Sequence, residues 1–429
     1  MSHRTYDRRQ LLKISAGAGA AALAAPSVVR ASRAQVSGKI VFVIWADAVE
    51  TASWDPIVAK FNETQPDIQV EVQAVPAESW AGFFDAVSTR IAGGDVPDVM
   101  RVATEGQRLF ASRGLVEPLD DYLERDKAEL QDFFDDVHPN LVEWTKTLSS
   151  TDGKTYYVPH GFNTMCLWYH TEMFAAAGVE EPTDEWTWDD FQAAAKALTK
   201  PGVYGFHMPP AYFAGVMPWL LTNGASTLSD DWTESTVAEP AAIESAQFMA
   251  SLVADGISPK PGGEFDAFAT MAQGKLAMFG GGRWPTAAIR EAKLVDKVKL
   301  VAWPRKTQQG SPVGWDGHPI MQASQNKDAA WEFVKFLAST DAQSIEVGQG
   351  GPTVPPRRSL AKSEAFLKDA PEGMDKLYDA LDYATPIPSP DAGNIIEQDI
   401  IDTFTQILAG NQDPEEALKT LDQQISAEL

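Results

Sequence analysis

Residues 153–199, GKTYYVPHGFNTMCLWYHTEMFAAAGVEEPTDEWTWDDFQAAAKALT, alternate short apolar runs with prolines and glycines. The runs at 155–158 and 164–169 are rich in aromatic and β-branched residues, which predicts two short strands separated near Pro159. Each run is too short for a typical helix and has the length of a strand. The stretch therefore begins with two strands.

Two helices are expected in the second half of the same stretch. The run EMFAAA at 172–177 predicts a short helix that ends at Gly178, since glycine readily adopts the left-handed conformation of a helix end. The run TWDD at 187–190 predicts the capped start of a longer helix. Strands that alternate with helices in this way indicate an α/β fold.

The same alternation extends toward the N-terminus. The run KIVFVIWADA at 39–48 is apolar throughout, as expected of a strand buried on both faces of a parallel sheet. A helix is expected within 53–67 and a strand at 68–75. The segment 79–103 predicts a helix stopped by two glycines and then a short strand at 98–102.

The N-terminal segment 7–35, DRRQLLKISAGAGAAALAAPSVVRASRAQ, places twin arginines before a weakly apolar run. That run, 14–25, is shorter than the ~20 residues that a spanning helix needs. A basic start, a short apolar middle and a small-residue end are typical of an export signal. The pattern resembles the twin-arginine signal, although Asp7 and Leu11 depart from it, and an ordinary secretory signal is the alternative.

Export predicts where the mature chain acts. We expect cleavage after Ala34, so that 1–34 is a signal peptide and the mature chain begins at Gln35. Because Gln35 is not a cysteine, no lipid anchor is expected, and the predicted location is the periplasm. Beyond the leader no run of eighteen apolar residues follows, so no further membrane span is predicted.

Composition narrows the classes of partner. The whole chain of 429 residues carries a net charge of −25, and without 1–34 the charge is about −30. Such a surface repels nucleic acid and anionic lipid, so neither is expected as a partner. The single cysteine, Cys166, excludes an intramolecular disulfide. A hydrophobic fraction of 44% suffices for two domains, each with its own core.

Twin-arginine cargo often carries cofactors, but the sequence offers few cofactor motifs. The run GAGAAA at 17–22 fits a dinucleotide fingerprint but lies inside the predicted leader. The chain has no CxxC, HExxH, Walker loop or GxSxG motif, and its six histidines show no pair at metal-ligand spacing. We therefore expect no cofactor, no metal and no catalytic residue. A glycoside hydrolase with two paired carboxylates is the alternative that remains open.

The order of these segments resembles the extracellular solute-binding proteins of carbohydrate ABC transporters, a family that includes the maltodextrin-binding proteins. Further landmarks agree in order along nearly the whole mature chain. They are GGDVPDVM (93–100), GLVEPLDDYL (114–123), FATMAQGKLAMFGGGRWPTAAI (268–289), VKLVAWPRKTQQGSPVGWDGHPIM (298–321) and KDAAWEFVKFLASTDAQ (327–343).

The resemblance implies a type II periplasmic binding protein fold with two α/β lobes. In this family several chain segments, called crossings here, join the lobes, and the ligand is held in the cleft between them. Lobe one is expected at 38–160 plus 317–347, and lobe two at 161–316 plus 348–429.

Some candidate binding residues come from lobe one. Ligands of α/β sheets lie beyond the carboxyl ends of strands, and Trp45 and Asp47 follow the first buried strand. A tryptophan can cover the C–H face of a sugar, and a carboxylate can accept its hydroxyls. Asp47 could instead merely cap the next helix. Glu105 matches the region where the family carries a sugar-contacting acid.

Other candidates follow from the resemblance at the crossings and in lobe two. Asn163 and the neighbouring His160 lie in the first crossing, and Tyr212 matches a family aromatic that stacks on sugar. Trp284 follows three glycines that would let the backbone turn closely around a ligand, which makes it the strongest candidate.

The second crossing supplies Trp315, Asp316 and Gly317, which could also be a simple turn. Arg357 or Arg358 could pair with an anionic substituent of the ligand or merely neutralise nearby acids.

The expected function is therefore that of a non-catalytic binding component of an ABC importer. It would close its hinge around a mono- to trisaccharide or a small glycoside and deliver it to the membrane permease, acting as a monomer. A polyol or another non-sugar solute is an alternative ligand.

Overall fold

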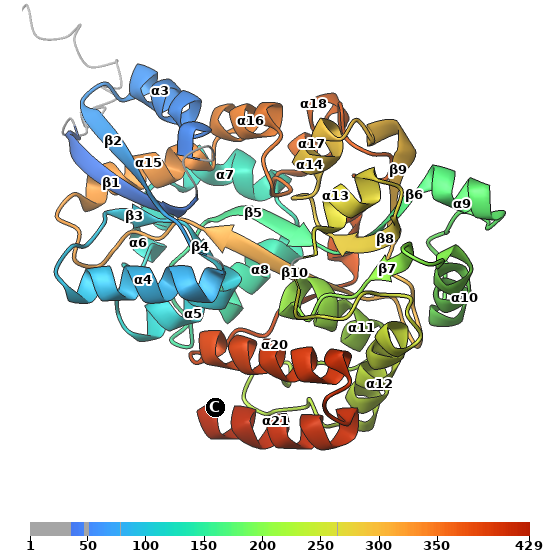
Figure 1. The fold of residues 1–429 in the computed structure, drawn as a ribbon. Helices are drawn as coiled ribbons and strands as arrows, with labels where there is room; N and C mark the ends of the chain where they lie inside the picture. Colours follow the sequence, from blue (N-terminus) through green and yellow to red (C-terminus); the bar gives the residue numbers. More distant parts are fainter. Residues whose placement is uncertain (1–35, 47–50, 78, 264) are drawn as a thin grey trace, which may run out of the picture. The chain divides into compact units, whose positions relative to one another are not determined.

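A computed structural model of the chain describes residues 36–46, 51–77, 79–263 and 265–429 (Figure 1). The predicted leader and Asp47 lie outside these residues. Within the described ranges, no helix combines the length and the apolar character that crossing a membrane requires.

The first sheet is parallel and has β1 (Gly38–Trp45) at its centre, between β2 (Ile68–Val75) and β3 (Val99–Met100). Phe42, Val43 and Ile44 of β1 are buried, which confirms the strand expected at 39–48. The helix α15 packs on β1, and α16 packs on α3. The helices of this half are α3 (Asp55–Thr64), α4 (Trp80–Ala92), α5 (Thr104–Ser112), α6 (Asp120–Arg125), α7 (Lys127–Asp136), α8 (Pro139–Leu148), α15 (Lys327–Leu337) and α16 (Thr340–Gln349).

The second sheet has the order β7-β8-β6-β9 and a separate core. Its strand β6 (Cys166–His170) runs antiparallel to β8 (Leu276–Gly281) and to β9 (Val298–Ala302), while β7 (Tyr204–His207) is parallel to β8. The helices of this half are α9 (Thr171–Ala177), α10 (Trp188–Leu198), the π-turn η1 (Tyr212–Val216), α11 (Met217–Thr222), α12 (Pro240–Ala254), α13 (Ala267–Ala272), α14 (Thr286–Glu291) and the 3₁₀ turn η2 (Val295–Lys297).

A central sheet joins the two halves. Its strand β10 (Ser311–Gly317) pairs antiparallel with β5 (Pro159–Thr164) and with β4 (Val102–Ala103), and parallel with β11 (Ala384–Pro386). Figure 1 shows β5 and β10 between the sheet of β1 and the sheet of β8. The chain therefore passes from the first half to the second through β5 and returns through β10.

The C-terminal segment brings further helices to both halves. The long helix α20 packs on α12, α21 and η1 and also on α4 and α5. It therefore contacts the second half and the first. The elements of this segment are α17 (Arg358–Ala361), α18 (Glu364–Leu367), α19 (Lys376–Asp379), the 3₁₀ turn η3 (Ala380–Asp382), α20 (Gly393–Ala409) and α21 (Pro414–Glu428).

The helices expected between 172 and 199 are confirmed. The helix α9 ends at Gly178 with φ of 67°, in the left-handed region that glycine tolerates. The helix α10 begins at a complete capping box, in which the Thr187 hydroxyl accepts from the backbone N–H of Asp190 and the Asp190 carboxylate accepts from that of Thr187.

The strand boundaries near Pro159 were predicted wrongly. No regular strand forms at 155–158, and the first strand is β5, which begins at Pro159 itself. Proline fits the first residue of a strand, where the ladder does not need its missing N–H. The strand expected at 98–102 is also two strands, because the chain leaves the first sheet after Met100 and enters the central sheet at Val102.

Candidate functional site

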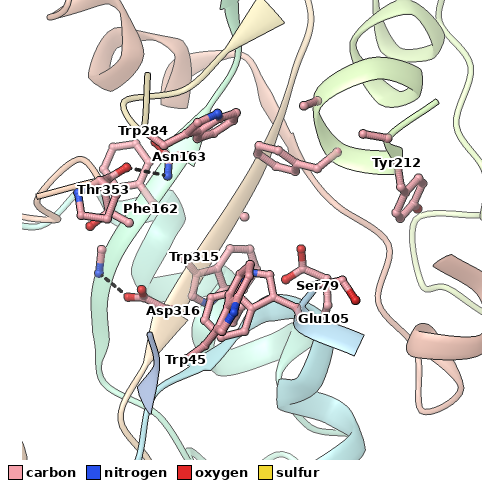
Figure 2. Close-up of a pocket in the computed structure, with 18 of the residues that line it drawn as sticks. Trp45, Ser79, Glu105, Phe162, Asn163, Tyr212, Trp284, Trp315, Asp316 and Thr353 are labelled. Atoms are coloured by element: carbon pink, nitrogen blue, oxygen red, sulfur yellow. Dashed lines mark hydrogen bonds between the residues drawn. The ribbon is translucent and has the colours of Figure 1, made fainter. Parts of the chain in front are cut away.

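A cavity of about 630 Å³, called the main chamber here, is lined by residues from both halves of the fold (Figure 2). The first half contributes the end of β1 and the starts of α4 and α5, and the second half contributes η1, α20 and the segment after β8. The central strands β5 and β10 supply the wall between them. A concave site of this volume is typical of small-molecule binding.

Aromatic rings form much of the chamber wall. Trp45 stands at the carboxyl end of β1, and its indole N–H donates to the Ala77 carbonyl at 2.9 Å, which fixes the ring. Trp80 contacts Trp45 edge to face, with 4.6 Å between ring centroids. In Figure 2, Trp284 lies on one side of the chamber and Trp45 and Trp315 lie on the other. Such rings can cover the flat C–H faces of a ligand.

The glycines after β8 shape the segment that carries Trp284. A Cβ on Gly280 would lie 2.6 Å from the Trp303 ring, and one on Gly282 would lie 2.5 Å from Asn163 Oδ1. Both glycines are therefore required by neighbouring side chains of the protein. This differs from the prediction from sequence, in which the glycines let the backbone turn closely around a ligand.

Asn163 lines the chamber, but its amide already serves the fold. Its Oδ1 accepts from the backbone N–H of Arg283 at 2.8 Å, and its Nδ2 donates to the Pro352 carbonyl at 3.3 Å. The side chain thus ties β5 to the segment after β8 and to a third connecting segment near 352. These bonds position Trp284, which follows Arg283 directly.

Asp316 is also held by protein groups. It is buried, accepts from Arg101 Nε at 2.6 Å and accepts from the backbone N–H of Gly161 at 2.8 Å. Arg101 lies where the chain leaves the first sheet, so this buried ion pair ties that sheet to β10. Its geometry supports a structural role at the junction beside the chamber.

Two carboxyl groups face the chamber without an ion pair among the described residues, namely Glu105 on α5 and Glu397 on α20. Burial, opposed by a backbone hydrogen bond and reinforced by the charge of Asp316, raises the pKa of Glu105 to about 7. Burial and the charge of Glu105 raise the pKa of Glu397 to about 8. The helix α5 belongs to the first half, and α20 packs on both halves.

Tyr212 lines the chamber from η1 and is buried. Its hydroxyl lies 2.7 Å from the Thr227 hydroxyl and donates to the Pro388 carbonyl at 3.3 Å. Burial raises the pKa of Tyr212 far above its ordinary value, so the phenol stays protonated. The hydroxyl is therefore engaged within the protein.

Seven of the expected residues line the main chamber: Trp45, Glu105, Asn163, Tyr212, Trp284, Trp315 and Asp316. Whether each contacts a ligand stays a prediction. Asp47 lies outside the described residues.

Three expected residues are placed elsewhere. His160 is buried and does not line the main chamber. Its Nε2 lies 2.7 Å from Glu346 Oε2, and its ring centroid lies 4.4 Å from that of His318. Gly317 is buried where β10 meets β4, and a Cβ there would lie 3.0 Å from the Val158 carbonyl.

Arg357 does not line the chamber either. Its guanidinium is 3.1 Å from the Asp132 carboxylate on α7 and donates to the Ala338 carbonyl at 2.9 Å. This corrects the expectation that it answers an anionic ligand, and it agrees with the alternative that it neutralises nearby acids. The segment that carries Arg357 is thereby fastened to the first half of the fold.

The chamber-lining residues that sequence reasoning missed include Trp80, Phe213 and Glu397. Trp80 begins the helix that follows β2, beyond the carboxyl end of that strand, so the rule that indicated Trp45 at the end of β1 could have found it. Glu397 directly follows Ile396 of the buried stripe Ile396, Ile400, Phe404 and Ile407 on α20. Asp399 and Asp402 lie on the same helix, so no local signal separated Glu397 from them.

Comparison with known families decides the class of the protein. The model of the family described as bacterial extracellular solute-binding protein matches residues 45–344. The chain belongs to this family. Its members are extracellular or periplasmic binding proteins of ABC transporters and are non-catalytic, so the glycoside hydrolase alternative is set aside.

Solved structures of similar proteins share the two-lobed α/β fold of periplasmic binding proteins. A substrate-binding protein of Listeria monocytogenes, solved with cycloalternan, is 25% identical, covers 91% of this chain and 99% of its own, and has a TM-score of 0.80. A protein of Thermotoga lettingae, bound to α-D-tagatose, is 24% identical, with coverages of 91% and 99% and a TM-score of 0.78. One of Agrobacterium vitis, bound to D-mannitol, is 21% identical, with coverages of 91% and 98% and a TM-score of 0.72.

Proposed function

We propose that this solute-binding protein captures a sugar in the main chamber, closes its two lobes around it and delivers it to the permease of an ABC importer. The observation that carries this is the composition of the chamber wall. The indoles of Trp45, Trp80 and Trp284 line it together with the carboxyls of Glu105 and Glu397, which have no ion pair among the described residues. Flat rings cover sugar C–H faces, and a carboxyl group can bond sugar hydroxyls, as an acceptor when ionised and also as a donor when protonated.

The proposal includes closure by hinge rotation. The expected lobes are 38–160 plus 317–347 and 161–316 plus 348–429, which meet at the central strands. Closure excludes water, so each ligand hydroxyl must find a partner inside the chamber, and a sugar that leaves a carboxyl unmatched binds less well. The monomer is the proposed functional unit.

Export is part of the same proposal. The leader at 1–34 would direct the chain to the periplasm through the twin-arginine route and be removed after Ala34. Changing the arginines at 8 and 9 to lysine should leave precursor in the cytoplasm if that route is used. Sequencing the N-terminus of the exported protein checks the cleavage position, and export of the lysine variant at the normal level would indicate ordinary secretion.

The direct test is a thermal-denaturation screen of residues 35–429 against monosaccharides, oligosaccharides, sugar acids and polyols. A ligand at ~100 times its dissociation constant adds ~2.7 kcal/mol to the free energy of unfolding. We expect a rise in melting temperature with one related group of sugars and recovery of the sugar intact. A response to no carbohydrate contradicts the proposal.

A matched pair of variants then locates the site. Trp284→Ala should weaken binding of the sugar by ~10-fold or more, about 1.4 kcal/mol. Trp186→Ala removes a partly buried indole of the same half that packs on Phe174, away from the chamber, and should leave affinity unchanged. Equal loss of affinity in both variants would place the ligand elsewhere.

A polyol is the second candidate, because the Agrobacterium vitis neighbour is bound to D-mannitol. An acyclic polyol offers hydroxyls but no flat ring for an indole to cover. A mannitol response that survives Trp284→Ala, with no response to sugars, would favour this candidate.

A further inference from the structure

A second chamber adjoins the main one. Its volume is about 360 Å³, and Arg101, Trp284 and Pro352 line both chambers, so the two meet at these residues. The second chamber is bounded by the region around α3 on one side and by the start of α14 and the segment after α16 on the other. Its further lining residues are Ser53, Trp54, Ile57, Ala287, Glu346, Gln349, Gly350 and Gly351.

The second chamber repeats the chemistry of the main one. Trp284 borders it, and Trp54 adds a second indole, which is 3% exposed and packs on Phe42. Gln349 adds an amide, and Glu346 adds a carboxylate whose side chain is 20% exposed although it pairs with buried His160. Aromatic faces beside hydrogen-bonding groups suit a polyhydroxylated ring better than a purely apolar group.

The charge state of Glu346 fits an acceptor role. Burial acts to raise its pKa, but the opposing effect of His160, helped by Arg101 and Arg283, brings the pKa below its ordinary value. The group is therefore a carboxylate at neutral pH and can accept from ligand hydroxyls. Its pairing with His160 holds it at the edge of the chamber.

The combined volume of the two chambers favours a ligand larger than a monosaccharide. The main chamber, at about 630 Å³, lies in the middle of the range of ~300–1,000 Å³ for small-molecule sites. Adding the second chamber, at about 360 Å³, brings the site close to the upper end of that range. A monosaccharide would leave much of this volume to water, whereas a chain of sugar units could pass from one chamber to the other beside Trp284.

We propose that the second chamber is a subsite for further sugar units of the same ligand, so that the preferred ligand is an oligosaccharide of three or more units that extends past Trp284. This rests on the proposed function, in which the ligand is a sugar. The main chamber would then hold one end of the chain and the second chamber the other.

The variant Ala287→Phe tests this subsite. Ala287 lines the second chamber only and is exposed, so a phenyl ring there occupies the chamber without disturbing the core. The matched control is Ala176→Phe, the same substitution at an exposed position of α9 that lines neither chamber. Unchanged melting temperatures of both ligand-free variants verify that they fold.

The probe is a defined mixture of mono- to hexasaccharides from starch, laminarin, xylan, mannan and fructan, with alditols included, and native mass spectrometry identifies what the protein retains. We expect the wild type and Ala176→Phe to retain species of three or more units. For these species Ala287→Phe should lose at least 10-fold in affinity, while affinity for shorter members of the same series changes less than 2-fold.

The outcomes separate the two proposals. Retention of mono- or disaccharides alone, or an unchanged preference in Ala287→Phe, overturns the subsite and leaves sugar capture intact. Retention of no carbohydrate by the wild type, or of alditols alone, overturns both.

Discussion

The carboxyl pair Glu105 and Glu397 should make the stability of the ligand-free protein depend on pH in a defined direction. Their pKa values are raised from 4.5 to about 7 and about 8, so the folded chain keeps protons that the unfolded chain has released. A raised carboxyl pKa stabilises the fold fully below pH 4.5, and this contribution is lost as the pH rises through 7 and 8. The variant Glu397→Gln removes one of the two titrations.

The magnitude follows from the number of protons involved. One proton of difference between the folded and unfolded states changes the free energy of unfolding by about 1.4 kcal/mol per pH unit. Between pH 5.5 and 7 both carboxyls contribute in the wild type, and Glu105 alone contributes in Glu397→Gln. The decline of stability with pH should therefore be shallower in the variant by about 1.4 kcal/mol per unit.

Urea denaturation followed by tryptophan fluorescence, at pH 5.5, 6.0, 6.5 and 7.0, measures this difference. Glu143→Gln on α8 is the control, because Glu143 is exposed and lies outside the chamber. Its curve should run parallel to that of the wild type. Parallel curves for Glu397→Gln as well would refute the reasoning, because Glu397 would then titrate alike in the folded and unfolded chains.

Three further predictions concern single residues. Gly282→Ala should lower the free energy of unfolding by ~1–3 kcal/mol in urea denaturation, because its Cβ would lie 2.5 Å from Asn163 Oδ1. An unchanged denaturation midpoint would contradict this, because the segment would then accommodate the methyl group without loss of stability. Asp316→Asn should cost ~3–5 kcal/mol in the same assay, since buried Arg101 loses its paired carboxylate, and a loss below 1 kcal/mol would contradict this. Cys166 is buried, which raises its thiol pKa to about 12, so a thiol reagent at pH 8 should modify it only in denaturant; rapid modification of the native protein would contradict its burial.

Much of the fold follows from local sequence because the decisive signals are local. The apolar run of β1 and the capping box at Thr187 need no knowledge of distant residues, and both are confirmed. The strand at Pro159 was misplaced because its pairing with β10, far along the chain, decides where β5 begins. Likewise, the break of the strand at Arg101 depends on Asp316, 215 positions away.

The residues of the candidate site also divide into those that local sequence predicts and those that depend on distant contacts. Trp45 could be predicted because it ends a buried strand, and ligands of α/β sheets lie beyond the carboxyl ends of strands. Glu397 was missed because its place depends on how α20 packs against η1 and α5, which its own segment does not reveal. The two roles considered for Arg357 could not be separated because nothing near it in sequence indicates that Asp132 on α7 is its partner.

The burial of the chain's one thiol in β6 has a practical consequence. Since Cys166 is the single cysteine and is enclosed, a cysteine introduced by mutation at the chamber wall would be the one position open to a dye. Ala211 lines the chamber and is partly exposed, so Ala211→Cys offers such a position. A polarity-sensitive fluorophore attached there would report the expulsion of water on the proposed closure as a shift in its emission wavelength. The protein can therefore be converted into an optical sensor of its own solute without first removing a native cysteine.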